Sequence, residues 1–278
     1  MTSRSQAVTA MLRSLSSFII IAVISLMNAS VQAQPAFDQI VVFGDSLSDN
    51  GNAGRSSNGP VWVEHLAEQL GLSLRPSQAG GMNFAVGGAR LDPRSGNTSL
   101  RAQASTYLRT SRPPGRSLNI VYGGGNDLLA AVGDPGGETM VASAVASLRS
   151  IVADLVGQGA TDILVPNLPG IGIAPAVRAQ GGQAVEAANG LAAHFNNALD
   201  QALSGFSSHT GLRLYRLDVW QLAERVKADP AAAGFVDITS PCAQHRRCEG
   251  YLFWDDVHPT TQAHRRLADA ALQVLKAP

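Results

Sequence analysis

The sequence has no excess of charge of either sign and few charged side chains. Lys plus Arg and Asp plus Glu number 21 each in 278 residues, and 15% of the chain is charged. Proteins that attract nucleic acid or anionic membranes through a global field carry a basic excess, so we expect neither partner. Internal repeats, blocks of like charge and a domain linker are also missing. We therefore expect one domain over residues 34–278.

Cysteine is scarce, with Cys242 and Cys248 the only two. His245 lies between them, but one histidine does not complete a zinc site, and no other ligand cluster appears. A dinucleotide fingerprint starting at Gly123 fails because Leu128 stands where its last glycine is required. We therefore expect no metal and no cofactor.

Residues 1–33 have the pattern of a secretory signal peptide. Arg4 and Arg13 precede an apolar run at 18–27, and the residues up to Ala33 suit cleavage after it. The run is about ten residues long, whereas a membrane span takes roughly 20. We therefore expect export to the periplasm or the medium, with no permanent membrane span after cleavage. In such a compartment Cys242 and Cys248 predict a local disulfide, with two free buried thiols as the alternative.

Short apolar runs alternate with longer stretches of helical spacing along the remaining chain. Buried parallel strands are predicted at 39–43, 118–122, 163–165 and 212–217. Helices are predicted at 61–70, 138–156, 184–203 and 261–275, and surface loops at 109–116 and 133–137. This alternation predicts a mostly parallel sheet with helices on both faces.

Four separated blocks carry the residues with chemical potential. They are FGDSLSD at 43–49, NFAVGGA at 83–89, YGGGND at 122–127 and WDDVHP at 254–259. Together and in this order they resemble the SGNH hydrolases, also called GDSL esterases and lipases. The resemblance implies a flavodoxin-like three-layer α/β/α sandwich and a serine hydrolase of carboxylic esters. An ordinary α/β-hydrolase is not expected, because Ser46 lacks the Gly-x-Ser-x-Gly motif.

Ser46 follows a predicted strand and is the candidate nucleophile. A serine hydroxyl needs a neighbouring base, and the imidazole of His258 suits that task. Asp255 precedes His258 by three residues and can hold its ring in the required tautomer. Asp256 is the competing carboxylate. The alternative is that Ser46 is a turn or cap residue and that the acidic pair only caps the following helix.

Attack on an ester carbonyl places negative charge on oxygen, which N–H donors stabilise. The resemblance implies the backbone N–H groups of Ser46 and Gly88 and the side-chain amide of Asn126 as donors. Gly87 is the alternative to Gly88, which lies five residues after Asn83 as in the family block. Gly88 and Asn126 are otherwise ordinary turn residues.

Other residues are expected to have structural roles around the site. Asp45 and Asp49 should bond to the backbone around the nucleophile turn, and Phe253 and Trp254 should line an acyl pocket or pack in the core. The remaining histidines are expected to be exposed or to have hydrogen-bond partners. These are His65, His194, His209, His245 and His264.

The block FWDDVHPT at 253–260 resembles the exported lipolytic branch of the family, which implies a small-molecule or lipid ester as substrate. Phospholipase or lysophospholipase activity, glycerophospholipid acyl transfer and carbohydrate acetylesterase activity are alternatives. A glycan- or lipid-binding protein that kept the fold and lost the chemistry is the non-enzymatic alternative. The sequence does not indicate the acyl-chain length of the substrate, the acceptor of the acyl group or the oligomeric state.

Overall fold

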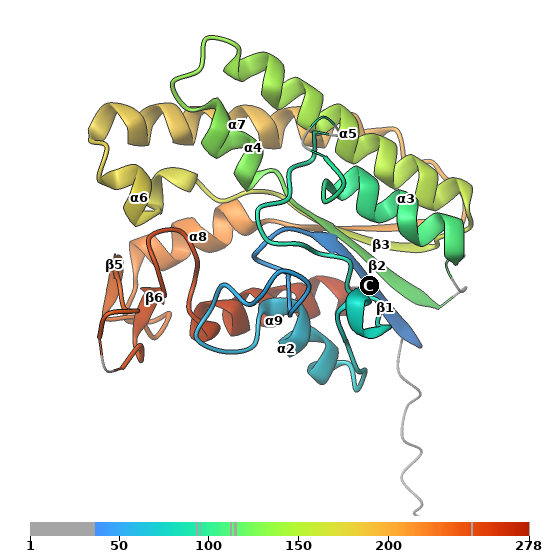
Figure 1. Ribbon diagram of the computed structural model, residues 1–278, viewed down its shortest axis with the longest axis horizontal. Coiled ribbons are helices and arrows are strands. Elements are labelled where there is room, and N and C mark those ends of the chain that lie inside the picture. Colours follow the sequence, from blue (N-terminus) through green and yellow to red (C-terminus); the bar gives the residue numbers. More distant parts are fainter. Residues whose placement is uncertain are drawn as a thin grey trace, which may run out of the picture. The chain divides into compact units, whose positions relative to one another are not determined.

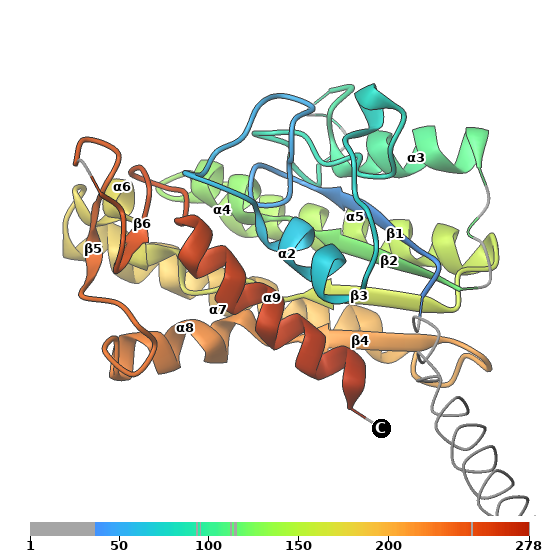
Figure 2. The same cartoon turned by 90° about the horizontal axis from the view of Figure 1, so that it is seen from below.

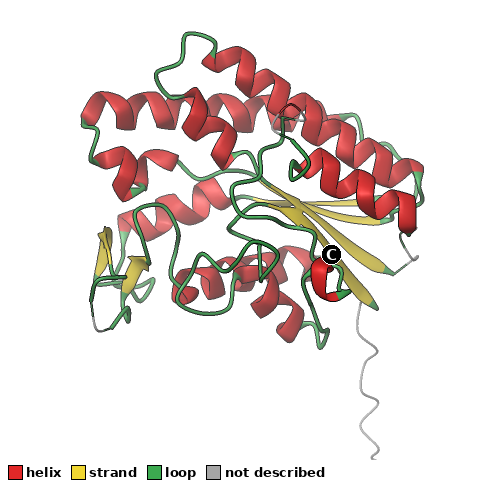
Figure 3. Ribbon diagram, viewed as in Figure 1, coloured by secondary structure: helices red, strands yellow, loops and turns green. Residues whose placement is uncertain are grey.

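The computed structural model describes residues 37–277 except 93, 95, 112, 114, 115 and 246. The predicted signal peptide and its cleavage site after Ala33 lie outside the described residues. Figure 3 shows a central group of strands with helices around it.

A four-stranded parallel sheet forms the centre, in the order β1-β2-β3-β4. Its strands are β1 (Gln39–Gly44), β2 (Ser117–Tyr122), β3 (Asp162–Pro166) and β4 (Arg213–Leu217). The first three are almost entirely buried, as expected for apolar strands covered on both faces. The expectation of a buried strand is wrong for β4, which is mostly half-exposed because it lies at the sheet edge.

An irregular segment continues the sheet on the other side of β1. Val42 donates to the carbonyl of Met82 and accepts from the N–H of Phe84, and the N–H of Val86 bonds to the Gly44 carbonyl. Residues 82–86 therefore take the place of a further strand. With that segment included, the strands follow the spatial order of a flavodoxin-like sheet. In such a sheet the strand order reverses beside β1, and ligands bind there, outside the carboxyl ends of the strands.

Helices cover both faces of the sheet, as Figures 1 and 2 show. One face carries α3 (Leu100–Thr110), α5 (Gly137–Gly157) and α7 (Gly182–Ser204), with the short α4 (Gly125–Ala131) beside α5. The opposite face carries α2 (Trp62–Gln69) and α9 (Thr261–Lys276), which pack together, and α8 (Val219–Ala228) beside α9. The predicted three-layer α/β/α sandwich is confirmed, and the four predicted helices appear within two residues of their expected ends.

Helix α5 is long and apolar enough to cross a membrane by length and composition, the one such helix in the described part of the chain. It contacts β2, α3 and α7, and its residues Val141, Leu148 and Leu155 are buried. Its apolar composition is therefore explained by packing against the sheet.

A second, two-stranded parallel sheet supports the loop that contains Asp255 and His258. It pairs β5 (Asp237–Pro241) with β6 (Tyr251–Phe253), and the Cys242–Cys248 disulfide closes the loop between them. The N–H of Cys242 bonds to the Phe253 carbonyl and that of Ala243 to the Trp254 carbonyl. The disulfide-bonded loop thus holds the chain that runs into Asp255 and His258.

Removing this disulfide should destabilise the protein without unfolding it. A cross-link closing so short a loop restricts the unfolded chain by about 2 kcal/mol, so Cys242→Ala with Cys248→Ala should lower the free energy of unfolding by about that amount. Urea denaturation measures it. Wild type under reducing conditions should match the double variant, and an unchanged midpoint in both would contradict the prediction.

Candidate active site

The four sequence blocks meet at the carboxyl edge of the sheet. Ser46 follows β1, Gly88 follows the edge segment 82–86, and Asn126 lies in the first turn of α4 after β2. His258 reaches the same edge from the loop between β6 and α9. Because parallel strands end at one edge, residues far apart in sequence converge there.

Ser46, His258 and Asp255 form a continuous chain of hydrogen bonds. The Nε2 atom of His258 lies 2.9 Å from Ser46 Oγ, and its Nδ1 atom lies 2.8 Å from Oδ2 and 3.0 Å from Oδ1 of Asp255. The competing carboxylate, Asp256, is exposed, and its backbone carbonyl accepts from Ala176. The geometry therefore places Asp255, not Asp256, against the imidazole.

Asp255 is held in its ionised form. Partial burial raises the pKa of its carboxyl group. Hydrogen bonds from the backbone N–H groups of His258 and Val257, and from the His258 ring, together lower the pKa by more, so the pKa lies below the ordinary value. Those backbone bonds measure 2.6 and 2.9 Å to Oδ1. The carboxylate is thus fixed in orientation and available to accept the Nδ1–H of His258.

The nucleophile turn is clamped from α3. Gln103 Oε1 accepts from the Gly44 N–H at 2.9 Å, and its Nε2 donates to the Gly44 carbonyl at 2.9 Å. A Cβ at position 44 would approach the Tyr122 carbonyl to 2.9 Å, so only glycine fits the end of β1. Gln103 belongs to no sequence motif, so its contact with Gly44 was not predicted.

Asp49 ties the nucleophile loop to the loop of Gly87 and Gly88. Its Oδ1 accepts from the N–H groups of Gly51 and Asn52, and its Oδ2 from those of Ala53 and Gly87, all at 2.7 to 2.9 Å. The side chain is fully buried, so these four donors depend on it. The Gly87 N–H is therefore occupied.

Unlike the Gly87 N–H group, the N–H groups of Gly88, Ser46 and Asn126 are not all occupied. Gly88 has φ of +76°, a conformation that favours glycine, and no described residue accepts from its N–H or from the Ser46 N–H. Asn126 Nδ2 donates to the Ala89 carbonyl at 2.9 Å, which uses one of its two amide hydrogens. Three N–H groups thus remain for a ligand oxygen in this part of the site.

A second polar network lies under the same loops. Asn83 Nδ2 donates to the Ser48 carbonyl and Asn50 Oδ1, and Asn52 Nδ2 donates to the carbonyls of Asn83 and Ala85, at 2.7 to 2.8 Å. Asn50 and Asn52 were also missed. Both asparagines follow Asp49 within three residues, just after a predicted buried strand, and this position was the sequence signal for their part in the loop.

Histidine 264 departs from expectation. It is buried in α9, and neither ring nitrogen has a hydrogen-bond partner among the described residues, so the prediction of an exposed or partnered side chain is wrong for it. By contrast His65 Nε2 contacts Thr261 Oγ1 at 3.1 Å, and His245 stacks on Tyr251. His264 lines a cavity that opens beside Ser46 and His258.

Phe253 also lines this cavity and is at the same time part of the core. The expected core packing of Phe253 is therefore confirmed, and its place in an acyl pocket stays a prediction. Within the described residues, no three His, Cys, Asp or Glu side chains gather in a way that would hold a metal ion.

Asp45 should make stability depend on pH. Burial, and less strongly the charge of Asp127, raises the pKa of its carboxyl group to about 7, although the Leu47 N–H bond opposes the shift. A raised folded-state pKa means that the stabilising contribution is present below about pH 4 and is lost as pH rises through 7. Asp45→Asn cannot ionise, so from pH 4 to pH 8 it should gain on the order of 4 kcal/mol relative to wild type.

Urea denaturation of both proteins at the two pH values measures this difference. Glu249→Gln, at an exposed position, serves as the control and should follow wild type. Equal pH responses of wild type and Asp45→Asn would contradict the assigned burial effect.

Comparisons with known proteins agree with this geometry. The family model for GDSL-like lipase/acylhydrolase matches residues 40–271. The chain is 26% identical to a phosphatidylcholine-sterol acyltransferase of Aeromonas hydrophila, over 91% of this chain and 94% of that protein. It is 25% identical to Lipase 1 of Photorhabdus luminescens, covering 92% of this chain but only 53% of that protein.

The fold has solved counterparts. The acetylxylan esterase Axe2 of Geobacillus stearothermophilus superposes with a TM-score of 0.55 at 19% identity, over 86% of this chain and 94% of that one. A lipolytic G-D-S-L protein of Veillonella parvula gives a TM-score of 0.53 at 14% identity, over 86% and 99%. At such identities the likeness concerns the fold. The family match over most of the sequence carries the assignment: the chain belongs to the GDSL-like lipase/acylhydrolase family and is an ester hydrolase.

Proposed function

We propose that the protein cleaves acyl and lipid esters through a covalent acyl-enzyme on Ser46, with His258 as general base and Asp255 as the carboxylate that orients it. The observation that carries this proposal is the hydrogen-bond chain from Ser46 Oγ through both ring nitrogens of His258 to Asp255. A serine alone is a poor nucleophile, and such an arrangement supplies the base and its tautomer.

In the proposed acylation step, Ser46 Oγ attacks the carbonyl carbon while its proton passes to His258 Nε2. Asp255 stabilises the imidazolium that forms. The C–O bond to the alcohol then breaks, and Nε2 returns the proton to the leaving oxygen. Water repeats the sequence on the acyl-serine and releases the acid.

The negative oxygen of each tetrahedral intermediate would accept from the N–H groups of Ser46 and Gly88 and from the Asn126 amide. Asp49 occupies the Gly87 N–H, which favours Gly88 over Gly87 as the donor. The bond from Asn126 to Ala89 holds the amide beside the Gly88 loop. Each such donor is worth about 2.7–4 kcal/mol in the transition state.

Acyl transfer to an alcohol is a second candidate, since it differs only in what attacks the acyl-serine. It is supported by the relative named as a phosphatidylcholine-sterol acyltransferase, of which this chain covers 94%. Adding a lipid alcohol to the ester assay and identifying the product separates the two reactions.

We further propose that residues 34–278 form one hydrolase domain that is exported after cleavage behind Ala33. The leader-like pattern of 1–33 supports export, and so does the Cys242–Cys248 disulfide, because disulfides persist in oxidising compartments. N-terminal sequencing of the protein recovered from periplasm and medium tests both the cleavage site and the destination.

Ser46→Ala should abolish ester turnover. The variant keeps the fold and loses the nucleophile, so hydrolysis of nitrophenyl esters from acetyl to palmitoyl should fall by more than about 10³-fold. Circular dichroism and the urea midpoint verify folding. Full activity of a folded Ser46→Ala protein would contradict the proposed nucleophile, and no activity of wild type on any ester would favour the non-catalytic binding alternative.

Asp49→Asn should slow catalysis with little change in KM. An amide has one acceptor oxygen where four N–H groups now share two, so the Gly87–Gly88 segment shifts, and a shift of this kind costs about 100-fold in kcat. Asp237→Asn makes the same chemical change in β5, at a side chain whose Oδ1 accepts from the N–H groups of Thr239 and Ser240, and should stay within about twofold of wild type. A kcat equal to that of wild type in Asp49→Asn would show that the loop does not depend on this carboxylate.

A further inference from the structure

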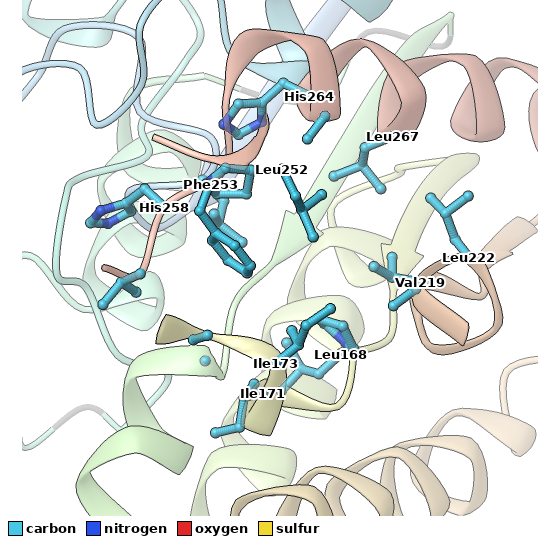
Figure 4. A pocket seen from close by; sticks show the side chains of 18 of the residues that line it. Leu168, Ile171, Ile173, Val219, Leu222, Leu252, Phe253, His258, His264 and Leu267 are labelled. Carbon is cyan, nitrogen blue, oxygen red and sulfur yellow. The ribbon is translucent and has the colours of Figure 1, made fainter. Parts of the chain in front are cut away.

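A cavity of about 190 Å³ lies beside the catalytic edge and is lined by β6, α8, α9 and the segment after β3 that contains Leu168 and Ile171. Ser46, Asn126 and His258 belong to its lining. The wall beyond them consists mainly of branched aliphatic side chains, labelled in Figure 4: Leu168, Ile171, Ile173, Val219, Leu222, Leu252 and Leu267.

Few charged side chains line the cavity. Asp45 belongs to the lining, and its pKa is raised to about 7. Burial lowers the pKa of His264 to about 3, so its ring is neutral in the physiological range. Arg266 also contributes to the lining but lies on an exposed stretch of α9. An apolar guest gains free energy here by leaving water, whereas a polar or sugar group would lose its hydration.

The walls are held in place by asparagine side chains. Asn196 bonds to both the N–H and the carbonyl of Leu168, at 2.9 and 2.8 Å, and Asn189 Oδ1 accepts from the Gly172 N–H at 3.0 Å. Asn167 Oδ1 accepts from the N–H of Val219 at 2.7 Å. These bonds fix the segment 168–173 and the start of α8, which form part of the cavity wall.

We propose that this cavity binds the acyl chain of the substrate and limits it to medium length; this rests on the proposed esterase function. An apolar cavity of about 150 Å³ holds the six carbons of benzene. Scaled by volume, about 190 Å³ holds roughly eight carbons. Octanoyl esters therefore fit, acetyl esters leave most of the apolar wall uncovered, and a palmitoyl chain projects out of the cavity.

The acyl side of the ester, not the alcohol side, belongs in this cavity. The acyl group stays bonded to Ser46 through both chemical steps, whereas the alcohol must leave before water attacks from the side of His258. An alcohol in the interior would have to depart past the acyl-serine. Occupancy by the acyl chain leaves the exit free.

Leu222 is the residue best placed to set the chain length. Among the side chains labelled in Figure 4 it lies far from His258, at the opposite end of the cavity beside Val219. It is half-buried on α8, so a larger side chain can enter the cavity without disrupting the central core. Leu191, also half-buried but on α7 and outside the lining, offers a matched control.

The test is kcat/KM for nitrophenyl esters from acetyl to palmitoyl in wild type, Leu222→Trp, Leu222→Ala and Leu191→Trp. Wild type should peak near octanoyl. Leu222→Trp should lose at least tenfold on octanoyl and stay within twofold on acetyl, Leu222→Ala should move the peak to longer chains, and Leu191→Trp should match wild type. A wild-type rate that rises up to palmitoyl, or one profile shared by all four proteins, would overturn the proposal.

Binding of free octanoate to the Ser46→Ala variant separates this proposal from the proposed function. Calorimetry should detect binding that Leu222→Trp in the same background weakens at least tenfold. Ester turnover that depends on Ser46, without this octanoate binding, would leave the esterase function standing and refute the acyl cavity. Octanoate binding without any ester turnover would support the cavity and refute the proposed chemistry.

Discussion

The site depends on one hydrogen bond between the two ends of the described chain. Ser46 Oγ and His258 Nε2 meet at 2.9 Å although 212 residues separate them. Ser46 is fixed by the end of β1, while His258 is fixed by Asp255 and by the small β5–β6 sheet. In the proposed mechanism, a displacement of either support by about an ångström would cost on the order of 100-fold in rate. The sheet, the clamping glutamine and the disulfide-bonded loop all maintain this contact.

Buried polar side chains carry out much of that maintenance. Asp49, Gln103 and Asn83 satisfy backbone groups that irregular loops leave unpaired, and all three are buried. An unpaired buried N–H group costs about 1–3 kcal/mol, so these residues determine which loop conformation is stable. The same loops present the free N–H groups of Ser46 and Gly88. The cost of burying these polar side chains is offset by their hydrogen bonds to the loops.

The parts of the fold that were predictable from sequence are those with local signals. The apolar strand at 39–43 and the periodic helix at 138–156 have such signals, and four ordered blocks identified the family. The rest depends on long-range contacts. Strand β5 has the polar sequence DITSP and forms only by pairing with β6. Gln103 meets Gly44 across 59 residues with no motif. The burial of His264 and the cavity beside it arise where β6, α8, α9 and the turn Ile171–Ile173 meet.

Ser46 should be the one hydroxyl group that this arrangement activates. The most direct test is to treat the folded protein with an alkyl fluorophosphonate, digest it and locate the adduct by peptide mass spectrometry. We predict a single adduct on Ser46, which disappears when His258 is replaced by alanine. A folded protein that remains unlabelled, or an adduct on another residue, would contradict this prediction.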